Sequence, residues 1–488
     1  MAITFLTDNR AKKIAFWALF LVMAAHLILY VGTTANPFLR SDGWFFVSDF
    51  LIPFYEGNFG FSDLYVVRNA ADHVQPLHRI LFIINAILFD LDFRYEAVLG
   101  ALFAVVLAGM MCLHFKKTHG ITEFPKDLTL GMLAVVALVF SLNSTITFRW
   151  SLPAIGFMPV FLNVGFFIYL SNCIVKNEGS GILLVTLGFL VLFVGDDVSV
   201  LVMIVAVLVL LVAAFVQKKN HIWKYLIIIM SMVAAYQLFK GYMVSEYVGN
   251  GNKSVILNCV EYYIENWDVI YKVIAAPFSD SFIHQMHLSM YPDIKEGVSL
   301  FMGYALIFLH LYTWYVFFKY KLYKKSYLPV MLMLYSYALT AGIMMYRVPD
   351  FGVNYIHSPR YVKTYQIGLW GCAWGLLSLY AVKGVTSSYV KLYKNVLYVA
   401  VFLIMLVQFV HAGRAWNAQK YNIAWQKRHA AKIVYYGGDE LFGKPCPEAN
   451  PRYPICKMDH ERRDTLVGFL KINKLNVFSE RIRQDYLY

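Results

Sequence analysis

The sequence predicts an all-α protein that crosses a membrane many times, and three observations support this prediction. Apolar residues make up 59% of the 488 residues and charged residues only 15%, which is more apolar material than a soluble core could bury. The apolar residues form uninterrupted blocks, and a block of about 18 or more is typical of a bilayer-spanning helix. Short lysine-bearing loops separate many blocks, so the net charge of +13 indicates membrane orientation and anionic lipid, not nucleic acid.

Eleven blocks qualify as spans, and an odd number places the two ends of the chain on opposite sides. With a cytoplasmic N-terminus, the short lysine-bearing loops lie inside and the tail beyond Arg414 lies outside. The first block lacks a small-residue cleavage site, so we expect a retained helix and not a signal peptide. The spans are centred on residues 14–31, 97–115, 127–146, 155–174, 181–195, 198–216, 224–244, 298–318, 328–345, 366–382 and 395–411.

The blocks divide the chain into a transmembrane domain, 1–411, and an outer C-terminal region, 412–488. In the first outer loop, the apolar segment 77–89 is too short for a full span, so we expect a re-entrant or interfacial helix. An amphipathic helix is expected in the 245–297 loop. A further outer loop, 346–365, holds most of the candidate site residues together with the first loop (32–96).

Two of the six cysteines differ from the rest. Cys446 and Cys456 bracket the short, proline-containing stretch CPEANPRYPIC in the only long polar region. This spacing favours a disulfide and therefore an oxidising compartment. Two thiols are too few for a metal site, and the sequence offers no other metal or cofactor motif that we favour.

Arginine and lysine are distributed differently on the two sides. Apart from Arg10, the inner side uses lysine only, whereas arginine is concentrated outside. Arginine presents a planar fork that binds phosphate or carboxylate through two hydrogen bonds. We therefore expect an anionic ligand at the outer face. The outer arginines are Arg40, Arg68, Arg79, Arg94, Arg149, Arg347 and Arg360.

The stretch RSDGWFFVSDFLIPFYEG begins at Arg40 and combines acidic with aromatic residues. We expect an interfacial helix with its aromatic side chains, Trp44 among them, at headgroup depth. Asp42 is at a candidate N-cap and is a candidate general base for a hydroxyl acceptor. Asp49 is the alternative base, and Glu56 is a candidate acceptor contact. A solvated polar face remains the alternative for both Asp49 and Glu56.

Three further outer segments could bind phosphate and sugar. DHVQPLHRI suggests phosphate contact at headgroup level or a snorkelling cluster, and its histidine spacing does not favour zinc. FRW adds an arginine, and the dense segment from Met345 to Gln366 suits a sugar phosphate or a purely structural loop. The candidate phosphate ligands are His73, His78, Arg79, Arg149, Arg347, Arg360 and Lys363. The candidate sugar or acceptor contacts are Trp44, Glu56, Tyr355, His357 and Tyr361.

The SDGWFF loop, the PLHRI motif, the many spans and the outer tail together resemble the GT-C glycosyltransferases. Among these the chain looks most like bacterial serotype-converting O-antigen glucosyltransferases. The resemblance implies an essential acidic residue in the first outer loop, which maps onto Asp42, and a late Arg-Tyr loop, which maps onto Arg360 and Tyr361. The paired acidic motif of the family is interrupted because Gly43 follows Asp42, so the choice between Asp42 and Asp49 stays open.

This resemblance implies transfer of a sugar, by analogy glucose, from a polyprenyl-phosphate carrier to O-antigen of lipopolysaccharide. The transfer would occur on the periplasmic face of the bacterial inner membrane, without metal or cofactor and with inversion. A lipid-sugar synthase and a flippase would be functional partners. The alternatives are an O-antigen polymerase or ligase, and a lipid-linked sugar transporter or flippase. The sequence has no internal repeat of the kind transporters carry, and its ionisable residues gather at one membrane face.

Overall fold

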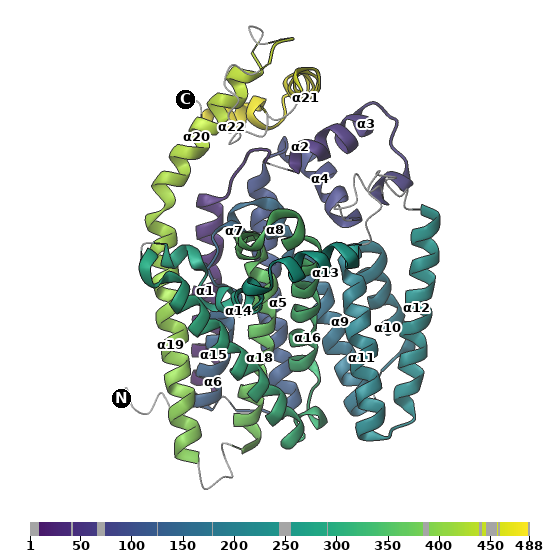
Figure 1. Ribbon diagram of the computed structural model, residues 1–488, viewed down its shortest axis with the longest axis vertical. Coiled ribbons are helices and arrows are strands. Elements are labelled where there is room, and N and C mark those ends of the chain that lie inside the picture. Colours follow the sequence, from purple (N-terminus) through teal and green to yellow (C-terminus); the bar gives the residue numbers. More distant parts are fainter. Residues whose placement is uncertain are drawn as a thin grey trace.

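The computed structural model shows an all-α, multi-pass membrane protein (Figure 1). A bundle of long helices carries a smaller helical layer at one end, which we call the cap. In the predicted orientation the cap lies on the outer side. The structure describes residues 9–40, 42–65, 74–123, 125–177, 179–243, 255–289, 291–383, 390–438, 442–445, 456 and 459–486.

Eight helical stretches in the described residues are long and apolar enough to cross a membrane. Three further predicted spans correspond to helices that run beside them in Figure 1 but are shorter or less apolar, so the count of eleven stays a prediction. These three are α6 (Lys126–Val139), α10 (Gly181–Phe189) with the π-helical turn η3 (Leu190–Val194), and α18 (Val362–Lys383). The eight are α1 (Asn9–Thr34), α5 (Phe93–His119), α8 (Ser151–Ile155) continued by α9 (Phe157–Lys176), α11 (Val200–Gln217), α12 (His221–Met243), α15 (Pro292–Lys319), α16 (Leu328–Tyr346) and α19 (Val390–Asn417).

Glycines allow helices of the bundle to approach backbone to backbone. A Cβ atom added to Gly100 of α5 would lie 2.2 Å from the carbonyl oxygen of Ala154 in α8. A Cβ on Gly303 of α15 would lie 2.4 Å from the carbonyl oxygen of Ala275, and one on Gly371 of α18 would be similarly close to α16. Apolar burial does not drive helix association in lipid, so such close contacts supply much of the packing energy.

The cap has a hydrophobic core of its own, built from the two ends of the sequence. The first outer loop supplies α2 (Gly43–Phe46), the π-helical turn η1 (Val47–Leu51), α3 (Ile52–Tyr55) and α4 (Pro76–Phe89). The C-terminal region supplies α20 (Gln419–Tyr436), α21 (His460–Ile472) and α22 (Glu480–Tyr486). Buried side chains from both sets form one cluster, so the C-terminal region is packed on the first loop.

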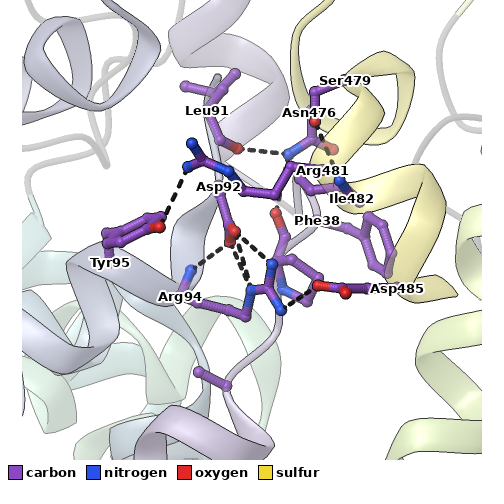
Figure 2. A network of polar contacts seen from close by, with 12 residues as sticks. Phe38, Leu91, Asp92, Arg94, Tyr95, Asn476, Ser479, Arg481, Ile482 and Asp485 are labelled. Atoms are coloured by element: carbon purple, nitrogen blue, oxygen red, sulfur yellow. Dashed lines mark hydrogen bonds and ion pairs between the residues drawn. The ribbon is translucent and has the colours of Figure 1, made fainter. Parts of the chain in front are cut away.

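A buried asparagine fastens the two halves of the cap together (Figure 2). The side-chain amide of Asn476 donates hydrogen bonds to the carbonyl oxygens of Pro37, at 2.9 Å, and Leu91, at 2.7 Å. Beside it, Arg94 makes ion pairs with Asp92 and with Asp485, both at 2.7 Å. Cys456 is disulfide-bonded. Its predicted partner, Cys446, lies outside the described residues.

The stretch from Gly43 to Tyr55 is helical, as predicted, but its surroundings differ from the prediction. Trp44, Phe46 and Phe50 are buried in the cap core, so these aromatic side chains pack against protein and do not face lipid headgroups. The helix also continues through Pro53, because the π-helical turn of η1 precedes it and changes the hydrogen-bond register. Helix α4 has 14 residues and lies in the cap, which agrees with an interfacial position and not with a span.

The amphipathic helix predicted in the 245–297 loop is present as two helices. α13 (Val255–Glu265) is followed, after the turn at Trp267–Val269, by α14 (Ile270–Phe282), which packs into the bundle against α15 and α18. α13 turns Ile256, Val260 and Ile264 outward. The hydroxyl of Tyr263 in the same helix donates to the carbonyl oxygen of Met344 at 3.1 Å.

Candidate functional site

The cap and the bundle meet at residues 144–155, which we call the junction segment. It contains the single-turn helix α7 (Ile146–Arg149) and α8, and the extended backbone of Trp150 separates the two. Because the segment folds back at Trp150, its polar groups point toward several neighbours. Its hydrogen bonds join Asn36 N to Arg149 O (2.8 Å), Ser144 Oγ to Pro359 O (2.7 Å) and Lys363 Nζ to Pro153 O (2.9 Å).

Three half-buried arginines lie in or beside the junction segment: Arg40, Arg149 and Arg360. None of them makes an ion pair within the described part of the chain. Burial lowers the pKa of Arg40. Burial also lowers the pKa of Arg149, against an opposing effect of Tyr30 and with a smaller contribution from the nearby charge of Arg40. Arginine remains protonated regardless, so these side chains place uncompensated positive charge at the junction. Such an arrangement is costly without an anionic ligand, because a buried charge needs a partner.

Arg360 lies in an aromatic cluster formed by two single-turn helices, η8 (Val353–His357) and η9 (Pro359–Tyr361). Its guanidinium donates hydrogen bonds to the hydroxyls of Tyr355 and Tyr361 and lies over both rings, 5.3 and 5.0 Å from their centroids. The Nε atom of Arg360 is buried without a hydrogen-bond partner among the described residues. The predicted grouping of Tyr355, Arg360 and Tyr361 is therefore present as a compact cluster.

A buried carboxylate anchors this cluster to the bundle. Asp280, at the end of α14, is 0% exposed, and its Oδ2 lies 2.8 Å from Nδ1 of His357. The carbonyl oxygen of His357 is 2.7 Å from Nε2 of His284. The side-chain amide of Asn143 donates to the carbonyl oxygen of Asp280 and accepts from the backbone amide of His284, both at 2.7 Å. His357 is thus a positioning residue, because its imidazole is committed to Asp280.

An apolar groove reaches this cluster from the lipid-facing side of the bundle. Its volume is about 220 Å³. Tyr365 forms its link to the Arg360 cluster, because this side chain lines the groove while its hydroxyl donates to the carbonyl oxygen of Ile356 at 2.7 Å. Ile274, which also lines the groove, is 44% exposed, so the groove opens at the bundle surface. The lining residues are Ile274, Pro277, Phe278, His310, Ser336, Tyr337, Thr340, Ala341, Met344 and Tyr365.

Asp42 lies on the cap side of the junction. It is the N-cap residue of α2, as predicted, but its side chain makes no capping hydrogen bond. The carboxylate is half-buried and has no hydrogen-bond or ion-pair partner within the described ranges. A carboxylate in this condition can accept a proton from a ligand.

The other candidates of the first outer loop are packed within the cap or exposed on it. Arg462 of α21 binds Asp49 at 3.1 Å, and Glu56 is exposed at the end of α3. Trp44 is buried in the cap core. These three do not join the cluster around the junction segment, and His73 lies outside the described residues.

The two remaining candidates of α4, His78 and Arg79, are buried in the cap. Nε2 of His78 lies 3.5 Å from Oε2 of Glu96, and Arg79 donates to the carbonyl oxygen of Asp63. His78 also lines a small cavity that it shares with Arg40, whereas Arg79 does not. His78 is therefore close to the junction, and Arg79 is a contact within the cap.

Lys363 and Arg347 complete the predicted phosphate ligands. Lys363 is 9% exposed, and its ammonium lies between Pro153 O and the ring of Phe157. Burial lowers its pKa to about 7. It therefore fastens the start of α18 to α8. Arg347 is half-buried at the end of α16, close to the single-turn helix α17 (Val348–Phe351).

Sequence reasoning missed two residues of this region. Arg40 was counted among the outer arginines but not assigned to the site, because its unpaired state depends on tertiary structure. Asp280 is the only acidic residue in the stretch VIAAPFSDSFI, which is a signal that could have been noticed. Within the described residues, no group of three or more His, Cys, Asp or Glu side chains is arranged to hold a metal ion.

Comparison of the chain with protein-family models, with curated proteins and with solved structures found no match.

Proposed function

We propose that this protein is a glycosyltransferase that moves a sugar from a polyprenyl-phosphate carrier to a cell-surface glycan such as O-antigen. The observation that carries the proposal is the apolar groove that Tyr365 links to the cluster around Arg360, an arginine without an ion-pair partner among the described residues. A lipid-linked sugar phosphate combines an apolar chain with an anion at headgroup depth. The groove and the arginines supply one matching feature for each.

The lipid end of the donor matches the groove. A prenyl chain is apolar and flexible, and a groove that opens at the surface of the bundle lets the chain enter sideways from the bilayer. The cavity of about 220 Å³ takes only the part of the chain nearest the phosphate, and the rest stays in lipid.

The phosphate end matches Arg360. Its aromatic neighbours orient the guanidinium, and Tyr365 connects this cluster to the groove. A guanidinium that is already fixed in place stabilises the charge that develops on a leaving phosphate. Arg149, on the adjacent turn α7, adds a second positive charge at the junction.

Asp42 is the general base in this proposal. The acceptor hydroxyl oxygen attacks the anomeric carbon of the donor and forms the new glycosidic bond. The bond from that carbon to the phosphate oxygen breaks, and its electron pair leaves with the prenyl phosphate. The hydroxyl proton goes to the Asp42 carboxylate. A single displacement of this kind inverts the anomeric centre.

The proposal is tested by measuring sugar transfer from a short-chain prenyl-phosphate glucose to a glycan acceptor with the purified protein. Asp42→Asn should lower turnover by roughly 10²- to 10⁴-fold, the usual contribution of a general base, while leaving membrane insertion intact. Asp49→Asn is the matched control, because Asp49 is a surface ion-pair partner of Arg462 and its loss should change turnover only a few-fold. Near-normal turnover of Asp42→Asn would remove this residue from the reaction. Absence of any transfer by the unmodified protein with a range of donors would count against the proposal itself.

A further inference from the structure

Arg40 is held by the faces of two tryptophan rings from different parts of the molecule. Its guanidinium carbon lies 5.0 Å from the ring centroid of Trp150 in the junction segment and 5.8 Å from that of Trp425 in α20. No hydrogen bond or ion pair joins this guanidinium to another residue in the described ranges. The side chain is half-buried, so water satisfies it only in part.

This way of holding an arginine leaves its hydrogen-bond donors unused. A guanidinium that lies over aromatic rings is held through its flat faces, while its five N–H groups point outward from its edge. The edge matches two oxygens of a carboxylate or a phosphate. Two tryptophans therefore fix the position of Arg40 without supplying the oxygens that its fork would bind.

The space beside Arg40 is suited to one such oxygen. Arg40, Gly43, His78 and Trp150 line a cavity of about 10 Å³, which is about the room that a single water-sized atom needs. His78 and Arg40 are the charged or titratable side chains in its wall. This cavity lies on the cap side of the junction segment, whereas the apolar groove lined by Tyr365 lies on the bundle side.

The charge around Trp425 also favours an anion. The chain from Phe351 to Gly438, which includes all of α20, contains no aspartate or glutamate. Lys427 and Arg428, next to Trp425 in sequence, are exposed. An anionic group that approaches Arg40 along α20 therefore meets no repelling carboxylate from this helix.

We propose that Arg40 binds a carboxylate or phosphate group carried by the acceptor, so that the acceptor is an anionic saccharide. This inference rests on the proposed function, since it assigns the donor phosphate to Arg360 and the acceptor to the cap side. Asp42 follows Arg40 by two residues, and the amide of Gly43 donates to the carbonyl oxygen of Arg40 at 2.9 Å in the same turn. An acidic group bound at Arg40 therefore brings a nearby hydroxyl of the same saccharide toward the proposed base.

The test measures saccharide binding by isothermal titration calorimetry with the purified full-length chain, and it does not need transfer. Two pairs of probes separate the two sources of the anion: trigalacturonate against galactotriose, and glucose 6-phosphate against glucose. We expect the acidic member of at least one pair to bind tenfold or more tightly than its neutral counterpart. Arg40→Gln should abolish this preference. Arg428→Gln removes the same charge from an exposed position of α20 and should retain it.

Several results would overturn the inference. These are equal binding of acidic and neutral probes, a preference that survives in Arg40→Gln, and an equal loss in Arg428→Gln, which would indicate a diffuse charge effect. If Arg40→Gln does not fold, Trp425→Leu removes one ring but keeps the charge, and it should weaken the preference several-fold; an unchanged preference would again overturn the inference. Transfer without any acidic preference would contradict this inference alone. An Arg40-dependent preference in a protein that transfers no sugar would contradict the proposed function and leave the anionic saccharide site standing.

Discussion

In the bundle, helices meet backbone to backbone at glycines, whereas in the cap they meet through large aromatic side chains and a buried asparagine. Gly100 lies against the carbonyl of Ala154, and no larger residue fits there. In the cap, Trp44 and Phe38 fill the interior, and Asn476 joins segments far apart in sequence. The difference follows from the surroundings. Burying apolar side chains is favourable in water, whereas in lipid hydrocarbon it provides no driving force for helix association. The bundle therefore depends on shape and the cap on burial and specific hydrogen bonds.

The largest expected effect tests the role of shape in the bundle. Gly100→Ala places a methyl group where the Ala154 carbonyl oxygen would be 2.2 Å away, so α5 and α8 must separate. We expect a loss of about 3 kcal/mol or more in stability, at the upper end of overpacking effects, measured as thermal unfolding in detergent. Gly109→Ala, in the same helix, is the control, because its Cβ atom would lie 3.7 Å from Phe20 in ordinary contact. It should be neutral or stabilising by up to about 1 kcal/mol. Equal losses of stability in Gly100→Ala and Gly109→Ala would contradict the view that close backbone contact holds the bundle together.

The second prediction tests the role of hydrogen bonds in the cap. Asn476→Ala removes the donor to the buried carbonyl oxygen of Leu91 and one of the two donors to that of Pro37, which keeps the amide of Phe93. It also removes the acceptor of the Leu39 amide, so the cap should be destabilised by roughly 2–4 kcal/mol. Hydrogen exchange should rise at cap amides and stay slow in the bundle. Asn473→Ala, which removes one hydrogen bond at the end of α21, should cost less than about 1 kcal/mol. Equally faster exchange in the bundle would show that the two cores unfold as one.

The smallest effect concerns Lys363, which fastens α18 to the junction segment. Its pKa in the folded protein is about 7, below the ordinary value of 10.5, so between these values the unfolded chain binds the extra proton. Stability should therefore rise with pH in this window, by about 2 kcal/mol from pH 7 to 9. Lys363→Met should lack this rise, and the difference between the two pH profiles of thermal unfolding measures it. Parallel profiles would show that folding does not lower the pKa of Lys363.

The sequence predicted the bundle well because its signals are local. An apolar block identifies a helix without reference to any other part of the chain, and the segments 77–89 and 255–265 likewise form the short helices that were expected. The shared core of the cap could not be predicted, because it pairs Phe38 with residues of α20 and α22. Periodicity within one segment does not indicate such a partner.

In the candidate site, too, the sequence predicted contacts between neighbouring residues but not contacts between distant segments. The sequence placed Tyr355, Arg360 and Tyr361 together because they are neighbours in the chain, and the structure brings them into contact. It did not reveal that Asp280 anchors His357 or that Trp425 covers Arg40, because these contacts join distant segments. It also left Asp49 as the alternative to Asp42, and the ion pair of Asp49 with Arg462 joins α21 to the first loop, a contact that the sequence did not reveal.

The shared core of the cap has a consequence for biosynthesis. During translation the first outer loop emerges early, with Trp44 and Phe46 lacking the C-terminal helices that later bury them. Trp425, the second ring over Arg40, is made only after the last span. A nascent or truncated chain that contains every helix of the bundle therefore still lacks the complete surroundings of Arg40. The proposed acceptor site forms only when the C-terminal helices pack on the first outer loop.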